Sequence, residues 1–356
     1  MPTLKEIADR VGVSISTVSR VMNNDSSRHI SPATREKILK AAEELGYVRA
    51  GSAGRSQGRT GRPSVKTRKT RRVGCIVSVP QNRYNHPYFS PILAGIERKL
   101  SELGCVLVFT ASMEELQGES VMRKLLEDAR LDGIIIVEGI PSDTYAFIKK
   151  TVPAVVGIDI SDPDIPVVLY DRVEAAKTAV RHLIDRGHRR IGFIGGTGRA
   201  GNLILEKRFR GFQAAMEEAG LAVDPDWILN AEWNVGRSYT LVRDLLAKNP
   251  ANRPTAIFAA SDMMAISAMR ACADAGLQIP RDMAFVGLDN IEVSQFTSPT
   301  LSTIHIPKLE MGMMAAKVLA DQLEGLNPLP FRMVLPFKLI TRQSSEVVRR
   351  EEPIGK

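Results

Sequence analysis

The chain has little of what secreted, membrane-spanning and metal-binding proteins need. Its 356 residues include three cysteines, which are widely spaced and set among apolar residues, so neither a disulfide framework nor a cysteine metal site is expected. No apolar run approaches the ~18 residues that a membrane-spanning helix requires. The first residues read as a capped helix, not as a charged and then apolar signal segment. We therefore expect a cytoplasmic protein without a metal or a membrane contact.

Signatures of catalysis are also missing, since the sequence has no GxSxG, HExxH or paired CxxC motif. Residues 196–201 match the GxGxxG spacing of a dinucleotide-binding loop after a predicted strand. The acidic residue that binds ribose should then end a second strand, but Glu217 and Glu218 fall inside a predicted helix. We expect no catalytic residue and no cofactor, and an NAD-dependent oxidoreductase is the alternative that the glycines leave open.

Positive charge is concentrated near the amino terminus. The net charge is +8, of which residues 1–50 contribute +2, residues 51–72 contribute +8 and the remainder −2. This asymmetry predicts a polyanionic partner for the first 72 residues, and not a generally basic surface.

Residues 1–50 have the pattern of three short helices. Thr3 and Glu6 form a capping box before the first helix, Ser14 caps the second over 15–23, and Ser31 caps the third, which begins with proline and ends before Gly46. Apolar residues at helical spacing predict a small common core: Ile7, Ala8, Val11, Val18, Val21, Ile38 and Leu45. Ile15, Ser16, Ser19 and Arg20 point the other way, as the groove-facing residues of a helix-turn-helix do. The alternative is a surface helical hairpin with solvated polar residues.

Residues 3–8 and 12–23 closely resemble the headpiece of the LacI/GalR family of bacterial transcription regulators. The resemblance implies a homodimer on a palindromic double-stranded DNA operator, with Ile15 and Ser16 selecting bases and Arg20 contacting guanine or phosphate. It also implies contacts with backbone phosphates from Thr17, Ser19, Asn23 and His29. Two helix-capping residues of the headpiece are likewise expected at the DNA, namely Thr3 and Ser14.

Residues 51–72 are rich in Gly, Ser and basic residues, which predicts a flexible linker. Family members usually have a short helix here, whose leucine inserts into the minor groove, but this chain has Arg49 and Gly54-Arg55-Ser56 at the corresponding positions. Residues 59–63 instead resemble an AT-hook. Two interpretations of this segment stay open: a solvated tether that adds only salt-sensitive affinity, or a segment whose basic residues bind the minor groove. The basic residues concerned are Arg55, Arg59 and Arg62, which are expected to contact DNA in either case.

From residue 73 onward, apolar runs alternate with amphipathic stretches in two successive rounds. Strands are predicted at 73–79, 104–109, 133–137, 154–160, 167–170, 190–194, 256–259 and 283–287. Helices are predicted at 91–103, 119–129, 143–150, 173–187, 205–220, 236–248 and 262–276. The alternation predicts an α/β fold with two parallel sheets, each covered by helices on both faces.

The family resemblance extends to this region through residues 85–89, 189–196, 208–212, 260–262, 287–289, 299–304 and 339–342. It implies a two-lobed type I periplasmic-binding-protein-like domain over 73–345 for effector binding and dimerisation. The expected first lobe covers about 73–171 and 304–332, the second about 172–303 and 333–345, and a tail follows at 346–356.

The resemblance also implies effector-binding residues at the carboxyl ends of the strands of each sheet. Asp159 and Asp289 stand at the carboxyl ends of predicted strands, and Arg208 offers a forked pair of donors. Trp233 is expected to stack on a sugar ring. These residues together favour a mono- or disaccharide effector, with a purine or nucleoside as the alternative.

Two further positions complete the expected effector site. Phe89, or Tyr88, closes it from the first lobe, although Phe89 is equally compatible with the core. Ser261 is expected to contact the effector, with the adjacent Asp262 as a helix cap. Effector and operator would then favour different arrangements of the chain, so that each weakens binding of the other.

Overall fold

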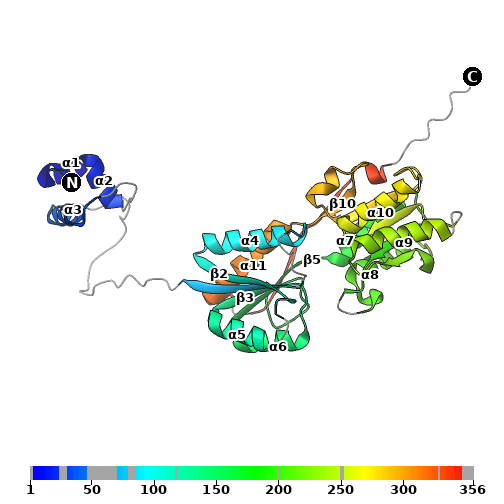
Figure 1. The fold of residues 1–356 in the computed structure, drawn as a ribbon, viewed down its shortest axis with the longest axis horizontal. Coiled ribbons are helices and arrows are strands. Elements are labelled where there is room, and N and C mark those ends of the chain that lie inside the picture. Colours follow the sequence, from blue (N-terminus) through cyan, green and yellow to red (C-terminus); the bar gives the residue numbers. More distant parts are fainter. Residues whose placement is uncertain are drawn as a thin grey trace, which may run out of the picture. The chain divides into compact units, whose positions relative to one another are not determined.

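The computed structural model describes residues 3–23, 30–45, 70–78, 85–116, 119–198, 201–248, 252–327 and 329–346. They belong to two compact units, one within Met1–Thr67 and one within Arg68–Lys356 (Figure 1). The linker predicted at 51–72, apart from its last three residues, lies outside the described residues, as does the tail after Glu346.

The amino-terminal unit contains the three predicted helices, α1 (Leu4–Val11), α2 (Ile15–Asn23) and α3 (Pro32–Glu44). The capping box is confirmed: the Glu6 amide donates to the Thr3 hydroxyl at 3.4 Å, and the Thr3 amide donates to the Glu6 carboxylate at 3.1 Å. Ser31 caps α3, because its hydroxyl accepts from the Thr34 amide at 3.2 Å.

These helices share one apolar core. Ile7, Val18 and Ile38 are fully buried at its centre, and each contributes roughly 1.5–3 kcal/mol relative to an exposed side chain. Two residues predicted for this core, Val11 and Leu45, are only half-buried and pack at its rim.

The second unit begins with a six-stranded parallel sheet in the order β11-β5-β4-β3-β1-β2. Its strands are β1 (Arg71–Val77), β2 (Cys105–Ser112), β3 (Gly133–Val137), β4 (Ala154–Ile158), β5 (Val167–Tyr170) and β11 (Arg332–Leu335). One face carries α4 (Phe89–Glu102) and α11 (Lys308–Leu323), and the other carries α5 (Glu119–Ala129) and α6 (Ser142–Thr151) (Figure 1). We call this part the first lobe.

The second lobe has a six-stranded sheet in the order β12-β10-β9-β8-β6-β7. The strands are β6 (Ile191–Gly195), β7 (Ile228–Asn230), β8 (Ala256–Ala259), β9 (Ala284–Asp289), β10 (Ser302–His305) and β12 (Lys338–Ile340), and β12 is antiparallel to β10. The helix α7 (Arg172–Asp185) packs on α8 (Lys207–Glu218), and α9 (Val235–Lys248) packs on α10 (Asp262–Asp274). The predicted α/β architecture is confirmed.

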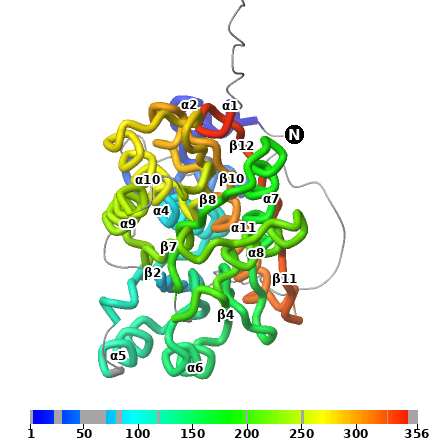
Figure 2. Tube along the Cα trace, turned by 90° about the vertical axis from the view of Figure 1, so that its right-hand side faces the viewer, coloured from blue at the N-terminus to red at the C-terminus, as the bar shows by residue number. Residues whose placement is uncertain are grey.

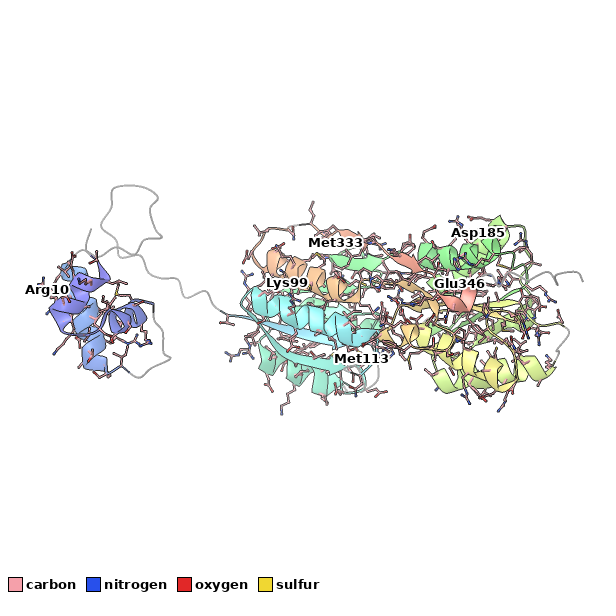
Figure 3. All side chains as sticks on the ribbon, turned by 90° about the horizontal axis from the view of Figure 1, so that it is seen from above. Arg10, Lys99, Met113, Asp185, Met333 and Glu346 are labelled. Atoms are coloured by element: carbon pink, nitrogen blue, oxygen red, sulfur yellow. The ribbon has the colours of Figure 1, made fainter. Side chains whose placement is uncertain are left out.

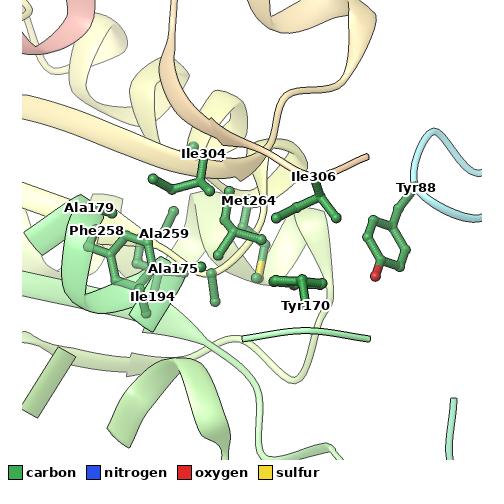
Figure 4. Close-up of a cluster of buried hydrophobic side chains, with 14 of the residues drawn as sticks. Tyr88, Tyr170, Ala175, Ala179, Ile194, Phe258, Ala259, Met264, Ile304 and Ile306 are labelled. Atoms are coloured by element: carbon green, nitrogen blue, oxygen red, sulfur yellow. The ribbon is translucent and has the colours of Figure 1, made fainter. Parts of the chain in front are cut away.

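The chain passes between the lobes three times: from β5 to α7, from β10 to α11, and from β11 to β12 (Figure 2). One apolar core continues through these connections, since Tyr88, Tyr170 and Ile306 belong to the same cluster as Ile194 and Phe258 of the second sheet (Figure 4). In Figure 3, the labels Lys99 and Met333 mark the first lobe, and Asp185 and Glu346 mark the second. The three connections and their shared core hold the carboxyl ends of the two sheets close together.

Close helix packing fixes the amino ends of α4 and α11. A Cβ added at Gly95 would lie 2.1 Å from the Leu309 carbonyl oxygen, and one added at Gly312 would lie 2.0 Å from the Ile92 carbonyl oxygen. The two backbones therefore touch, and this contact positions Tyr88, just before α4, and Lys308, the first residue of α11.

Two parts of the second unit differ from the prediction. The helix expected to begin at Leu205 begins at Lys207, because Leu203–Leu205 form a 3-10 turn and Glu206 caps α8. The sequence analysis also gave no helix for 308–323, where α11 packs against α4 and against strands of the first sheet. The short strands β7, β10, β11 and β12 were likewise not identified.

Candidate effector and nucleic-acid sites

Backbone strain concentrates where the strands of the two sheets end. Seven non-glycine residues among those described have a positive φ, which costs of order 1–3 kcal/mol each and persists where the surroundings enforce it. Six of the seven end or follow β3, β4, β7 and β9: Glu138, Asp159, Glu232, Trp233, Asp289 and Asn290. Ligands of α/β folds bind at this end of the strands.

A buried ion pair joins the two lobes at this point. Arg172, the first residue of α7, donates to Asp159 Oδ2 at 3.0 Å and also to Glu138, and both carboxylates come from the first lobe. The Tyr88 hydroxyl donates to the same Asp159 oxygen at 3.3 Å. The Arg172 and Asp159 side chains are 11% and 1% exposed, so this pairing occurs largely out of water. We call the surrounding polar residues the interlobe cluster: Tyr88, Glu138, Asp159, Tyr170, Arg172, Glu206, Arg208 and Asp289.

Burial and neighbouring charge oppose each other in the two carboxylates. Burial raises the pKa of Asp159, and the guanidinium of Arg172 only partly offsets this, so that its pKa lies above the usual value. Burial also raises the pKa of Glu138. The charges of Arg172 and then Arg208 lower it by more than burial raises it, so the pKa of Glu138 lies below its usual value. Glu138 is therefore ionised at neutral pH and pairs with Arg172.

Arg208 lies in α8 and is held from two sides. Its Nη1 donates to Glu206 Oε1 at 3.0 Å, and its guanidinium carbon lies 4.7 Å from the centre of the Trp233 ring. Trp233 is 37% exposed. It packs on Gly196, where an added Cβ would lie 2.7 Å from the Trp233 backbone nitrogen, so this close approach requires glycine. An exposed aromatic ring is thus fixed beside a buried guanidinium.

Asp289 is held at the end of β9 by charges from both lobes. Burial, and then the nearby charge of Asp262, raise the pKa of Asp289 to about 8, and the carboxyl is therefore mostly protonated at neutral pH. Lys308 of the first lobe donates to the Asp289 backbone carbonyl. Asp262 accepts from the Thr303 hydroxyl at 2.5 Å and from the Ile291 amide at 2.9 Å. A protonated Asp289 can donate a hydrogen bond to a ligand.

Four members of the interlobe cluster carry a buried polar atom without a hydrogen-bond partner. Six such side-chain atoms occur in the described part of the chain, and the four in the cluster are Asp159 Oδ1, Tyr170 Oη, Arg172 Nε and Arg208 Nε. An unsatisfied buried group costs about 1–3 kcal/mol. A ligand with closely spaced donors and acceptors would satisfy these atoms.

Four of the six predicted effector residues lie in or against this cluster, namely Asp159, Arg208, Trp233 and Asp289. Phe89 is buried at 7% exposure and packs edge-on against the Tyr88 ring, so it is Tyr88 that reaches Asp159. The hydroxyl of Ser261 accepts from the Met264 amide at 3.4 Å and caps α10. The expectation that Asp262 is the cap was therefore wrong, because its carboxylate is turned toward Thr303 and Ile291.

The sequence analysis missed Glu138, Tyr170, Arg172 and Glu206. Glu138 directly follows the strand Gly133–Val137, the same signal that selected Asp159. Arg172 and Glu206 stand at the starts of helices, where a charged residue gives no sign of the partner that tertiary contacts supply.

A cavity of about 480 Å³ lies beside the interlobe cluster. Residues of both lobes line it, including Pro87, Asn290, His305, Lys308 and Arg342, but none of the six predicted effector residues does. Within the described ranges, no group of three His, Cys, Asp or Glu residues could hold a metal ion. None of the helices described there is long and apolar enough to cross a bilayer.

The start of α2 is the candidate nucleic-acid surface. Ile15 is 48% exposed and Ser16 is also exposed, while Ser19 and Arg20 are half-exposed. The Ser14 hydroxyl lies 2.8 Å from those of Ser16 and Thr17 and caps the helix. Thr3 is engaged in the capping box. The Asn23 side chain, His29, Arg55, Arg59 and Arg62 lie outside the described residues.

Comparisons with known proteins agree with both parts of the chain. Residues 3–50 match the model of bacterial regulatory proteins of the lacI family, and residues 180–345 match that of the periplasmic binding protein-like domain. The transcriptional repressor MelR of Bacillus subtilis is 32% identical over 99% of both chains, and the repressor PurR of Aliivibrio fischeri is 30% identical over 91% of this chain and 92% of its own.

A solved complex of the transcriptional regulator CelR with cellobiose shares 28% of the sequence, with a TM-score of 0.68, and the match covers 97% of this chain and 100% of that one. The lac repressor dimer bound to operator, at 24% identity and a TM-score of 0.68, has the same fold, with coverage of 97% of this chain and 99% of that one. With a match to the lacI-family model at its amino terminus, a two-lobed periplasmic-binding-protein-like unit and relatives over nearly its full length, the chain belongs to the lacI family of bacterial regulatory proteins.

Proposed function

We propose that this chain is a homodimeric repressor of carbohydrate-utilisation genes, released from its operator by a mono- or disaccharide that binds at the interlobe cluster. The observation that carries the effector assignment is the set of four unpartnered buried atoms, which combine carboxylate, hydroxyl and N–H groups. Sugar hydroxyls both donate and accept, so a single sugar ring satisfies all three kinds of group.

The aromatic side chain at the edge of the cluster supports the same assignment. Trp233 presents an exposed ring whose position is fixed by Gly196 and Arg208, and the apolar face of a pyranose stacks on such a ring. One solved relative binds cellobiose, and another relative is named a ribose operon repressor. Relatives named PurR keep a purine effector as the second candidate, because Trp233 would also stack on a base.

DNA binding is assigned to the amino-terminal unit. Ile15 and Ser16, exposed at the start of α2, would contact base edges, and Arg20 would contact guanine or phosphate. One headpiece covers a half-site, so a palindromic operator requires two copies. An AT-hook-like contact by the segment around Arg62 would add affinity at A·T-rich centres.

Release follows from linkage between the two ligands. A sugar that bridges the lobes favours one interlobe arrangement, and the operator favours the arrangement that suits two headpieces, so each lowers the affinity for the other by the same factor. A nicotinamide enzyme is disfavoured, because the described residues between Gly201 and α8 include a 3-10 turn at Leu203–Leu205, and the α-helix begins only at Lys207.

The proposal is tested by gel shifts of the neighbouring promoter DNA with a panel of sugars and purines. We expect at least one sugar to weaken DNA binding and to raise the melting temperature. Asp159→Asn should abolish both effects and keep DNA binding, whereas the exposed Asp244→Asn should change neither. A panel in which only a purine acts would reassign the effector, and a protein that binds no promoter fragment at low salt would refute the repressor.

A further inference from the structure

We propose that Glu206 determines the charge of the effector: its carboxylate occupies the place in the interlobe cluster where a phosphate or carboxylate of a ligand would bind, so that the site accepts an uncharged polyol and excludes anionic sugars. This inference rests on the proposed function. It goes further because it predicts that the site binds neutral sugars and rejects sugar phosphates and sugar acids.

Glu206 first fills the amino terminus of α8. The helix is 12 residues long, and the free amides and the dipole at such an end attract anions. Glu206 Oε2 accepts from the amides of Arg208 at 2.7 Å and Phe209 at 2.9 Å. The anion-binding amides of this helix are therefore already bonded to a carboxylate of the chain itself.

The same carboxylate also forms an ion pair with the Arg208 guanidinium. Glu206 Oε1 accepts from Arg208 Nη1 at 3.0 Å, and both side chains are 8% exposed. One face of the guanidinium lies against Trp233. The buried Nε–H of Arg208 has no partner, and a single N–H suits a ligand hydroxyl, whereas an anion is best bound by two parallel N–H groups.

Two other positive charges in or beside the cluster, those of Arg172 and Lys207, also lie close to carboxylates. Arg172 is paired with Glu138 and Asp159. Lys207 lies half-buried near the same groups, and burial, followed by the charge of Arg172, lowers its pKa. Since Asp289 is mostly protonated at neutral pH, three basic side chains lie near three carboxylates, namely Arg172, Lys207 and Arg208 near Glu138, Asp159 and Glu206. A ligand anion would add repulsion from these carboxylates, and both guanidinium groups are already paired.

The capping residues at neighbouring helix ends follow the same pattern. The carboxylate of Asp171 accepts from the Glu174 amide at 2.9 Å at the start of α7, and Ser261 caps α10. The Asn234 side chain likewise accepts from the Arg237 amide at 2.9 Å at the start of α9. Each of the four helices that begin at this end of the second lobe, α7 to α10, therefore has an amide of its first turn bonded to a protein side chain.

The test removes the charge of Glu206 and keeps the cap. Glu206→Gln is isosteric, and Glu206→Ser is a second variant because serine is a good helix cap. The control is Glu218→Gln, an exposed carboxylate at the other end of α8. The probe is inorganic sulfate, titrated into the full-length protein against chloride at matched ionic strength, with the melting temperature as the readout and circular dichroism to verify folding.

We expect sulfate to stabilise Glu206→Gln and Glu206→Ser with at least tenfold higher apparent affinity than the wild type or Glu218→Gln. In a parallel arm, the wild type is titrated with matched pairs, such as ribose and ribose 5-phosphate, or galactose and galacturonate, and only neutral members should bind. The inference is overturned if folded Glu206 variants respond to sulfate as the control does, or if the wild type prefers an anionic member. Binding of no sugar at all would overturn the proposed effector instead, since the sulfate arm does not depend on it.

Discussion

Replacing Arg172 by methionine tests the buried ion pair that joins the lobes. Methionine keeps the length and apolar packing of the side chain, but it leaves Glu138 and Asp159 without their cation. Loss of one partner from a buried pair typically costs about 3–5 kcal/mol, because the remaining charge stays desolvated. The Glu138 side chain is 26% exposed, so we take the lower end, about 3 kcal/mol.

For a unit of this size, about 3 kcal/mol corresponds to a fall in melting temperature of roughly 6 °C. The loss should depend on pH. Without Arg172, the pKa values of both carboxylates in the folded state rise above those in the unfolded chain, so stability falls as pH rises from about 4. The difference from the wild type should therefore be larger at pH 8 than at pH 5.

The measurement is thermal unfolding at both pH values, with Arg181→Met as the matched control. Arg181 also contacts two carboxylates, but its side chain is 46% exposed, so water screens these pairs and its loss should lower the melting temperature much less than the loss of Arg172 does. Adding Glu138→Gln and Asp159→Asn to the Arg172 variant should restore most of the stability. The reasoning fails if both arginine variants melt alike, or if the neutralised triple variant is as unstable as Arg172→Met alone.

Three further predictions concern packing, protonation and DNA choice. Gly312→Ala should cost about 3 kcal/mol, because the new Cβ would lie 2.0 Å from a carbonyl oxygen of α4, whereas Gly236→Ala, with its nearest atom at 3.4 Å, should cost nothing; urea unfolding compares them. The folded pKa of Asp289, about 8, exceeds its value in the unfolded chain, so this group makes the wild type less stable as pH rises from about 4 to 8. Asp289→Asn should remove this loss, and the melting temperature of the variant should exceed that of the wild type most above pH 8. Substituting Ile15 and Ser16 by other residues should change the operator preference by about 1–3 kcal/mol per base pair, which selection from a randomised operator pool would measure. The circular dichroism spectrum should stay the same.

Local signals explain which parts could be predicted. The helices of the amino-terminal unit were placed correctly because Thr3, Ser14 and Ser31 act on amides within three residues. The strands Gly133–Val137, Val167–Tyr170 and Ala256–Ala259 were found as short apolar runs. Helix ends were less accurate wherever a 3-10 turn or an unexpected cap intervened, as before Lys207.

The effector residues divide in the same way. Asp159 and Asp289 were predicted because each stands at the end of an apolar strand, and Arg208 and Trp233 because of the family resemblance. Their ligand roles remain predictions. Glu206 could not be predicted as a site residue from the sequence. Its partner is the guanidinium of Arg208, which lies over the ring of Trp233, and this arrangement exists only in the folded protein.

The sequence by itself determined which structural units this protein has: an amino-terminal three-helix unit, followed by two rounds of alternating strands and helices. These could be predicted because capping, periodicity and charge act over a few residues. Only the tertiary structure decided which charges meet. Arg172 contacts Glu138 and Asp159 of the other lobe because three chain crossings bring two strand ends and the start of a helix together. Burial then strengthens these ion pairs, because water no longer screens the charges.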